Sequence, residues 1–125
     1  MSRLFWSLGC LFAFAGVAAG AFGAHALRDL LPQSLLAIFE TGVRYQMYHA
    51  LALLLTARAA ALWPGKLTTV AGWLFVGGIV IFSGSLYVLA TTGILWLGAV
   101  TPLGGVAFLT AWILLALAGW RARPA

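Results

Sequence analysis

Charged residues are scarce in this chain of 125 residues, and acidic ones are nearly absent. Lys, Arg, Asp and Glu together make up 7% of the sequence, and the two acids are Asp29 and Glu40. A soluble domain carries roughly 25% charged residues, so the composition excludes an ordinary soluble protein. The scarcity of carboxylates also disfavours coupled cation transport, which usually relies on an acid embedded in the membrane.

Cysteine is scarcer still, because Cys10 stands alone in the first apolar stretch. One cysteine supplies neither a disulfide framework within the chain nor a Cys/His metal cluster. The spacings HExxH and GxSxG do not occur, nor do paired carboxylates. The sequence therefore predicts that the protein is not an enzyme and holds no metal or cofactor.

What the chain does contain is long apolar stretches, with 64% hydrophobic residues and a mean hydropathy of +1.08. About 20 apolar residues suffice to cross roughly 30 Å of hydrocarbon. We therefore predict an all-α polytopic membrane protein, a single domain over residues 1–125 built as a bundle of four transmembrane helices. The predicted spans are residues 4–24, 43–62, 67–90 and 99–120. The first is longer than a typical signal-peptide core, so we expect it to be retained.

The segment between the first two spans, residues 26–42, is different because it carries charges among apolar residues at helical spacing. This pattern predicts a short amphipathic helix at the membrane interface. An alternative is an N-terminal extension of the second span that begins near Pro32.

The distribution of basic residues predicts the orientation of the chain. On one side of the predicted spans lie five basic residues and no acid, whereas on the other side Arg28 and Arg44 are offset by the two acids. The excess of Lys and Arg marks the cytoplasmic side, so both termini are expected there. The net charge of +5 fits anionic lipids as partners, and the scattering of the charges does not imply nucleic-acid binding. The five residues are Arg3, Arg58, Lys66, Arg121 and Arg123.

Small residues form stripes along three of the predicted helices, and such stripes mark close helix contacts in lipid. In the first span the stripe predicts packing within the chain or, alternatively, a homodimer contact. Two stripes on neighbouring faces predict that the third helix is the most enclosed. The stripes comprise Gly9, Ala13, Gly16, Gly20, Gly23 and Ala24; Gly77 with Gly84, and Ala71 with Gly78 and Ser85; and Thr101, Gly104, Ala111 and Ala118.

Most of the polar residues fall at the same ends of the four spans, so they should gather in one leaflet. We expect an inner polar network and an outer rim, with Thr101 also acting as the N-cap of the fourth helix. The network residues are Tyr45, Gln46, His49, Ser83, Ser85 and Tyr87, and the rim residues are His25, Glu40, Arg44 and Thr101.

His49 is the strongest single candidate, because an ionisable residue inside a membrane points to function. The structural alternative is a histidine that joins helices by bonding to Ser83, Ser85, Tyr87 or a backbone carbonyl. Haem ligation together with His25 and a serine–histidine pair are weaker alternatives. A further alternative is that His49 acts as the gate in a transport pathway.

Four segments resemble the domain-of-unknown-function family 423, in order and over nearly the whole chain. They run GAFGAHAL from Gly20, ETGVRYQMYHALA from Glu40, FSGSLY from Phe82 and TPLGG from Thr101. The resemblance implies a small four-helix protein of the bacterial inner membrane, with small transmembrane relatives in animals, and supplies no activity. Gly42, where relatives often have alanine, is expected to loosen the start of the second helix.

These observations together predict a non-catalytic membrane protein that presents an outward-facing polar pocket or surface. Its expected partner is a lipid, a small molecule or another membrane protein, and a homo-oligomer is a further expectation. The alternative function is a small-solute transporter or channel with His49 in the pathway.

Overall fold

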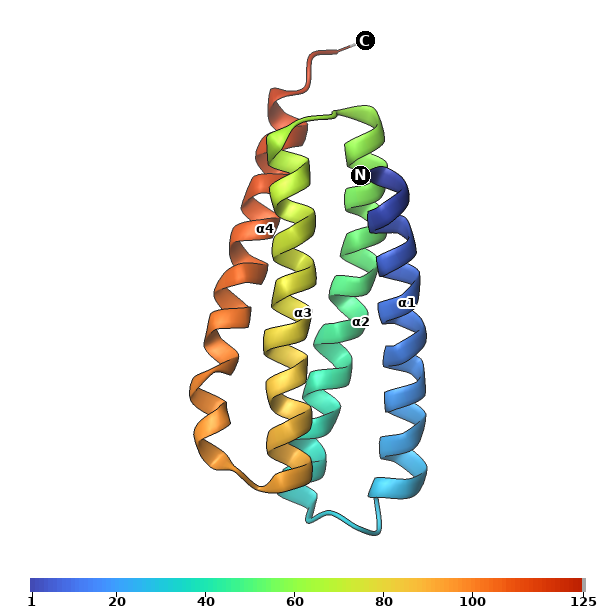
Figure 1. The fold of residues 1–125 in the computed structure, drawn as a ribbon, viewed down its shortest axis with the longest axis vertical. Helices are drawn as coiled ribbons and strands as arrows, with labels where there is room; N and C mark the ends of the chain where they lie inside the picture. Colours follow the sequence, from blue (N-terminus) through green and yellow to red (C-terminus); the bar gives the residue numbers. More distant parts are fainter. Residues whose placement is uncertain (125) are drawn as a thin grey trace.

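Four long helices make up the computed structural model, which describes residues 1–124. They are α1 (Ser2–Phe22), α2 (Gln33–Leu62), α3 (Lys66–Thr92) and α4 (Thr101–Arg121), and successive helices run in opposite directions (Figure 1). A π-helical turn, η1 (Gly23–Leu27), follows α1, and a 3₁₀ turn, η2 (Leu95–Ala99), precedes α4. The prediction of an all-α fold is thus confirmed for the described residues.

The helices are arranged as an open row in which each packs mainly on its neighbours in sequence. α2 and α3 occupy the middle of the row, and α1 and α4 lie at its two edges (Figure 1). Both termini and the turn between α2 and α3 lie at one end of the molecule, called here the termini end. The connections η1 to α2 and α3 to η2 lie at the other, the loop end.

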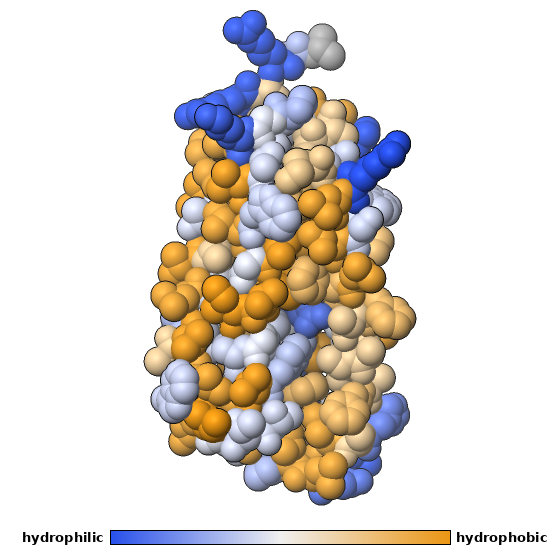
Figure 2. Space-filling view, in the orientation of Figure 1, coloured by the Kyte–Doolittle hydropathy of each residue, from blue (hydrophilic) through white to orange (hydrophobic). Residues whose placement is uncertain are grey.

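Three helical segments are long and apolar enough to cross a membrane: Ser2–Leu27, Lys66–Thr92 and Leu95–Arg121. Hydrophilic side chains gather at the two ends of the molecule, and the band between them is largely apolar on the face seen in Figure 2. The predicted second span, within α2, is not among the three, and its sequence contains Gln46, His49 and Arg58.

The segment before that span is not a separate interfacial helix. Pro32 stands immediately before the first residue of α2, and the helix then continues without interruption to Leu62. Leu36 and Phe39 of this first part are buried against Leu27 and Ala90. Tertiary packing therefore ties residues 33–42 to α1 and α3, so the alternative of a helix extension beginning near Pro32 is the correct one.

The small-residue stripe of α1 packs within the chain, as predicted. A Cβ atom added to Gly9 would lie 2.8 Å from Leu54 Cδ2 and 3.0 Å from the carbonyl oxygen of Ala50. One added to Gly16 would lie 2.6 Å from Met47 Sδ. The absence of side chains at these positions lets the α1 and α2 backbones approach closely.

The two stripes of α3 differ from each other. Ala71, Gly78 and Ser85 are buried, and Gly78 faces the ring of Phe108 on α4. A Cβ atom at Gly77 or Gly84 would meet nothing within 4 Å. α3 is the most buried of the three candidate spans, but only one of its stripes forms a helix contact.

Gly104 of α4 also takes part in the contact between α3 and α4, and its neighbour in the sequence provides a control. A Cβ atom at Gly104 would lie 2.6 Å from the backbone nitrogen of Phe82, whereas one at Gly105 would meet nothing within 4 Å. We expect Gly104→Ala to lower the free energy of unfolding by about 1–3 kcal/mol through overpacking against a backbone that cannot yield. Gly105→Ala should leave it unchanged or raise it by up to about 1 kcal/mol.

Unfolding in detergent micelles, followed by circular dichroism, measures both effects. Equal stability of the two variants would show that α4 does not approach α3 as closely as described.

Candidate functional site

Five of the six residues of the predicted polar network form separate hydrogen-bonded joints through their side chains, and Tyr45 contributes only its backbone carbonyl. The first joint connects α1, α2 and α3 through Gln46, which is buried in α2. The amide Nε2 of Gln46 donates to the carbonyl oxygen of Phe12 at 2.8 Å. Its Oε1 accepts from the hydroxyl of Tyr87 at 2.6 Å. Both ends of the amide are thereby engaged inside the protein.

The second joint connects α2 and α3 through a backbone carbonyl. The Ser83 hydroxyl donates to the carbonyl oxygen of Gly42 at 2.6 Å. A Cβ atom at Gly42 would lie 2.9 Å from the ring of Tyr87. Gly42 therefore allows α3 to approach α2 here, and it lies within a continuous helix, so the expectation that it loosens the helix start was wrong.

The third joint connects α3 to the first residue of α4. The hydroxyls of Ser85 and Thr101 are 2.6 Å apart, and Ser85 also donates to the carbonyl oxygen of Phe82 at 2.9 Å. Thr101 is buried and makes no side-chain cap, so its predicted role as N-cap was wrong. Thr101 thus belongs to the helix-joining contacts and not to the rim.

His49 forms the fourth joint, between α2 and α4. Its Nδ1 lies 2.7 Å from the carbonyl oxygen of Tyr45, and the indole nitrogen of Trp112 donates to its Nε2 at 3.2 Å. An indole N–H can only donate, so Nε2 is the acceptor and Nδ1 carries the hydrogen. The imidazole ring lies face to face on Phe108, with ring centroids 3.5 Å apart.

These contacts bear on the structural alternative for His49. The ring bonds to a carbonyl of its own helix and is joined to another helix by Trp112, which was not among the expected partners. The hydroxyls of Ser83, Ser85 and Tyr87 have the partners given above. Among the described residues, therefore, no serine hydroxyl is hydrogen-bonded to the histidine. Every buried side-chain nitrogen and oxygen of the described residues has a hydrogen-bond partner.

Two residues of this joint, Phe108 and Trp112, were missed from the sequence. Phe108 is buried four residues after Gly104 and three before Ala111, and so lies on the small-residue face of α4. That spacing is the signal that identifies it, because residues three and four apart share one side of a helix. Trp112 is the next residue after Ala111, and no pattern in the sequence marks its bond to His49.

A groove opens above this joint, between α2 and α4, with a volume of about 430 Å³. We call it the α2–α4 groove. His49 is 6% exposed and Tyr45 is 38% exposed, and the Tyr45 ring packs on Phe82 with centroids 4.8 Å apart. Apart from these two side chains and the Trp112 indole, the lining is apolar. The groove is lined by Tyr45, His49, Pro102, Gly105, Val106, Phe108, Leu109 and Trp112.

The remaining rim residues do not line this groove. His25 lies in η1, and Glu40 and Arg44 lie on α2; all three are exposed. The described residues contain no group of three or more His, Cys, Asp or Glu side chains placed to hold a metal ion. Of the predicted rim, only Thr101 makes a contact with the predicted inner residues, through Ser85.

Comparison with known proteins places the chain in a family. The model of the family described as "Protein of unknown function (DUF423)" matches residues 19–105. The chain belongs to this family. It is 50% identical over 117 residues to the UPF0382 membrane protein YwdK of Bacillus subtilis, a match that covers 93% of this chain and 95% of that protein. A UPF0382 membrane protein of Staphylococcus epidermidis is 46% identical over 116 residues, covering 93% and 94%. No solved structure matches the chain significantly.

The resemblance seen in the sequence is thereby confirmed, as is the assignment to a family of membrane proteins. The names of these relatives describe membrane proteins and state no activity.

The geometry around His49 predicts its tautomer. We expect nitrogen NMR of the histidine-labelled protein in micelles to show hydrogen on Nδ1 and none on Nε2, because Trp112 donates to Nε2. Trp112→Phe should lower the free energy of unfolding by about 1 kcal/mol, since it leaves Nε2 without a donor.

Trp120→Phe is the matched control, because Trp120 is 88% exposed and should tolerate the same change. A spectrum with hydrogen on Nε2 in the unaltered protein would contradict the described joint.

Proposed function

We propose that this chain is a non-catalytic protein of the bacterial inner membrane that holds a lipophilic molecule in the α2–α4 groove. The observation that carries the proposal is the groove itself: its lining is mostly apolar, and both ring nitrogens of His49 are already bonded. A site with these properties recognises its ligand by shape and apolar contact. The hydroxyl of Tyr45 is the polar group best placed to orient the ligand.

In this proposal all four helices cross the membrane, including α2. α2 lies between α1 and α3 over much of its length (Figure 1), and its 30 residues measure about 45 Å. Its polar residues Gln46, His49 and Thr56 are buried, whereas Leu51 and Leu55 are exposed. The exposed side chains at mid-helix are therefore apolar, and the exposed charges Arg44 and Arg58 lie about 21 Å apart, towards the two ends of the span.

The orientation follows from the same arrangement. Arg3, Lys66 and Arg121 belong to segments at the termini end, where Figure 2 shows several strongly hydrophilic side chains. Asp29 and Glu40, in contrast, belong to the segments of the loop end. The excess of basic residues supports a cytoplasmic termini end.

Cysteine labelling tests the four crossings and the orientation together, in a Cys10→Ser background. We expect a membrane-impermeant maleimide added to intact cells or spheroplasts to label Gln33→Cys and Gly98→Cys. Gly65→Cys and Arg123→Cys should react only after permeabilisation. Labelling of positions 33 and 65 from the same side would show that α2 does not cross.

A non-catalytic role is supported by the contacts of the polar side chains. Ser83 and Ser85 bond to Gly42 and Thr101, so neither hydroxyl is activated by His49 as a nucleophile would be. The contacts of His49 itself weaken the alternative of a transport pathway through this residue, since its ring is stacked on Phe108 and bonded to Trp112.

The ligand class follows from the groove's dimensions and location. A volume of about 430 Å³ lies within the range of small-molecule sites. In a membrane its open side faces the hydrocarbon, so the acyl chain of a lipid or another lipophilic molecule reaches it from the bilayer. A charged solute would have to lose its hydration there without a charged partner.

Filling the groove tests this function. Position 105 lines the groove and has room for a side chain, so Gly105→Leu should occupy the ligand's place without disturbing helix packing. We expect the amount of the co-purified apolar molecule, measured by mass spectrometry of an organic extract, to fall by roughly tenfold or more.

Gly77→Leu provides the matched control, because Gly77 also has open space around it but does not line the groove. It should leave the co-purified molecule unchanged. Equal retention in the two variants would refute the groove as the binding site.

A further inference from the structure

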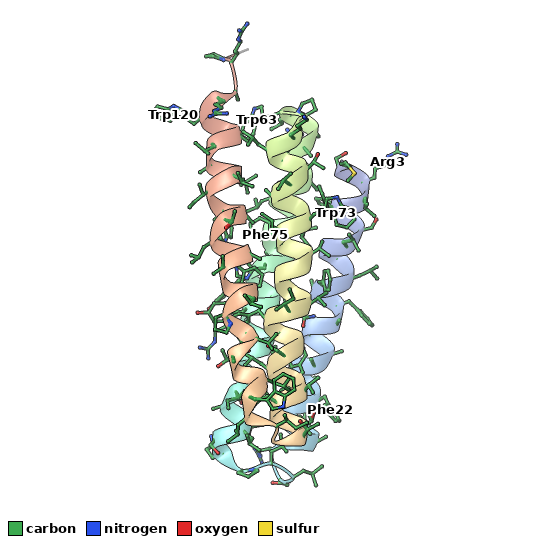
Figure 3. All side chains as sticks on the ribbon, turned by 60° about the vertical axis from the view of Figure 1, so that its left-hand side comes forward. Arg3, Phe22, Trp63, Trp73, Phe75 and Trp120 are labelled. Carbon is green, nitrogen blue, oxygen red and sulfur yellow. The ribbon has the colours of Figure 1, made fainter. Side chains whose placement is uncertain are left out.

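A second cavity lies at the termini end, where the start of α1 meets the last turns of α2. Its volume is about 440 Å³, and we call it the Arg3–Arg58 cavity. It lies between α1 and α2, shares no lining residue with the α2–α4 groove and does not depend on the function proposed there. Figure 3 shows Arg3 extending from the start of α1, at the end that also carries Trp63 and Trp120. The cavity is lined by Ser2, Arg3, Trp6, Ser7, Ala57, Arg58 and Ala61.

Two arginines contribute to this cavity, and the chain offers them no acid. The two acidic residues of the sequence are Asp29 and Glu40, in the segments of the loop end. Glu40 precedes Arg58 by 18 residues on the same helix, which is about 27 Å. Two guanidinium groups around one cavity repel each other unless an anion lies between them. No acidic side chain of the described residues therefore offsets the positive charge of this cavity.

The start of α1 adds hydrogen-bond donors to the positive charge. The first backbone bond of the helix runs from the nitrogen of Phe5 to the carbonyl oxygen of Met1, so the N–H groups before Phe5 have no acceptor one turn earlier. Such N–H groups and the helix dipole favour an anion. The hydroxyls of Ser2 and Ser7 line the same space.

The rest of the lining is suited to a hydrocarbon chain. Trp6 is 55% exposed, and an exposed tryptophan near a helix end is typical of the level of lipid headgroups. Ala57 and Ala61 are one turn apart on α2 and leave a shallow floor. The cavity thus combines two cationic side chains with apolar walls from Trp6, Ala57 and Ala61.

We infer that the Arg3–Arg58 cavity binds the phosphate headgroup of an anionic lipid. Arginine matches phosphate by paired N–H donors in a fixed plane, and two arginines from two helices enclose the phosphate between α1 and α2. Bound lipid thereby joins the edge helix α1 to the centre of the row. The acyl chains lie along Trp6 and the alanines of α2.

Native mass spectrometry of the purified full chain in mild detergent, titrated with dioleoyl-phosphatidylglycerol, tests this assignment. We expect the double variant R3Q/R58Q to bind this lipid at least tenfold more weakly than the unaltered chain. R121Q/R123Q removes two charges from the same end outside the cavity and should change the affinity less than threefold. R58K keeps the charge but loses the paired donors, so it should fall between the two.

Three outcomes would overturn the inference. An equal loss of lipid affinity in R3Q/R58Q and R121Q/R123Q would mean that the lipid is held by general electrostatic attraction and not by the cavity. Equal affinity for dioleoyl-phosphatidylcholine would mean that the negative charge is not recognised. Full competition by sodium phosphate would mean that the ligand is the free ion and not a lipid. Unchanged helix content and elution volume of R3Q/R58Q would exclude misfolding as the cause of a loss.

Discussion

The structure depends on one requirement: polar side chains carried into an apolar layer must find hydrogen-bond partners within the protein. α2 carries three of the seven buried polar residues, as many as α3, and it occupies a central place in the row, between α1 and α3. Gln46 reaches α1 and α3, and His49 reaches α4. The helix that looks least like a membrane span thus lies inside the row, and its polar residues bond to all three other helices.

Small residues allow these bonds to form at the required distances. Gly42 admits the ring of Tyr87, and Gly104 brings α4 against the backbone of Phe82. A hydroxyl or amide can bond a carbonyl of the next helix only when the backbones are close. The glycines and the hydrogen bonds therefore belong to one arrangement, in which the glycines set the distance and the polar side chains determine which helices pair.

Periodicity and composition predicted much of this fold. The helical class, the family and the packing of the α1 glycines were all readable, because residues that share a face also share an environment. The distinction between the two α3 stripes was not readable, since Gly77 and Gly78 look alike in the sequence but only Gly78 meets a neighbouring helix. A helical pattern shows which residues face together and does not show which helix they face.

The same limit explains the candidate site. His49 was identified as buried and important, but its partner Trp112 lies on a helix 63 residues later in the chain. Ser83 bonds the carbonyl of Gly42, and a backbone acceptor leaves no trace in the pattern of side chains. The expected residues form separate joints because only Gln46 and Tyr87 bond each other, whereas the other hydroxyls and the imidazole bond to groups outside the expected set or to the backbone.

The open row has a mechanical consequence for α4. This helix is fastened along one side, by α3, and at mid-length its direct tie to α2 is the bond between Trp112 and His49 with the stacked ring of Phe108. Because α4 packs on α3 alone along most of its length, its position relative to α2 depends on these few contacts. The distance between α2 and α4 is therefore set mainly by the hydrogen bond between the Trp112 indole and the His49 imidazole.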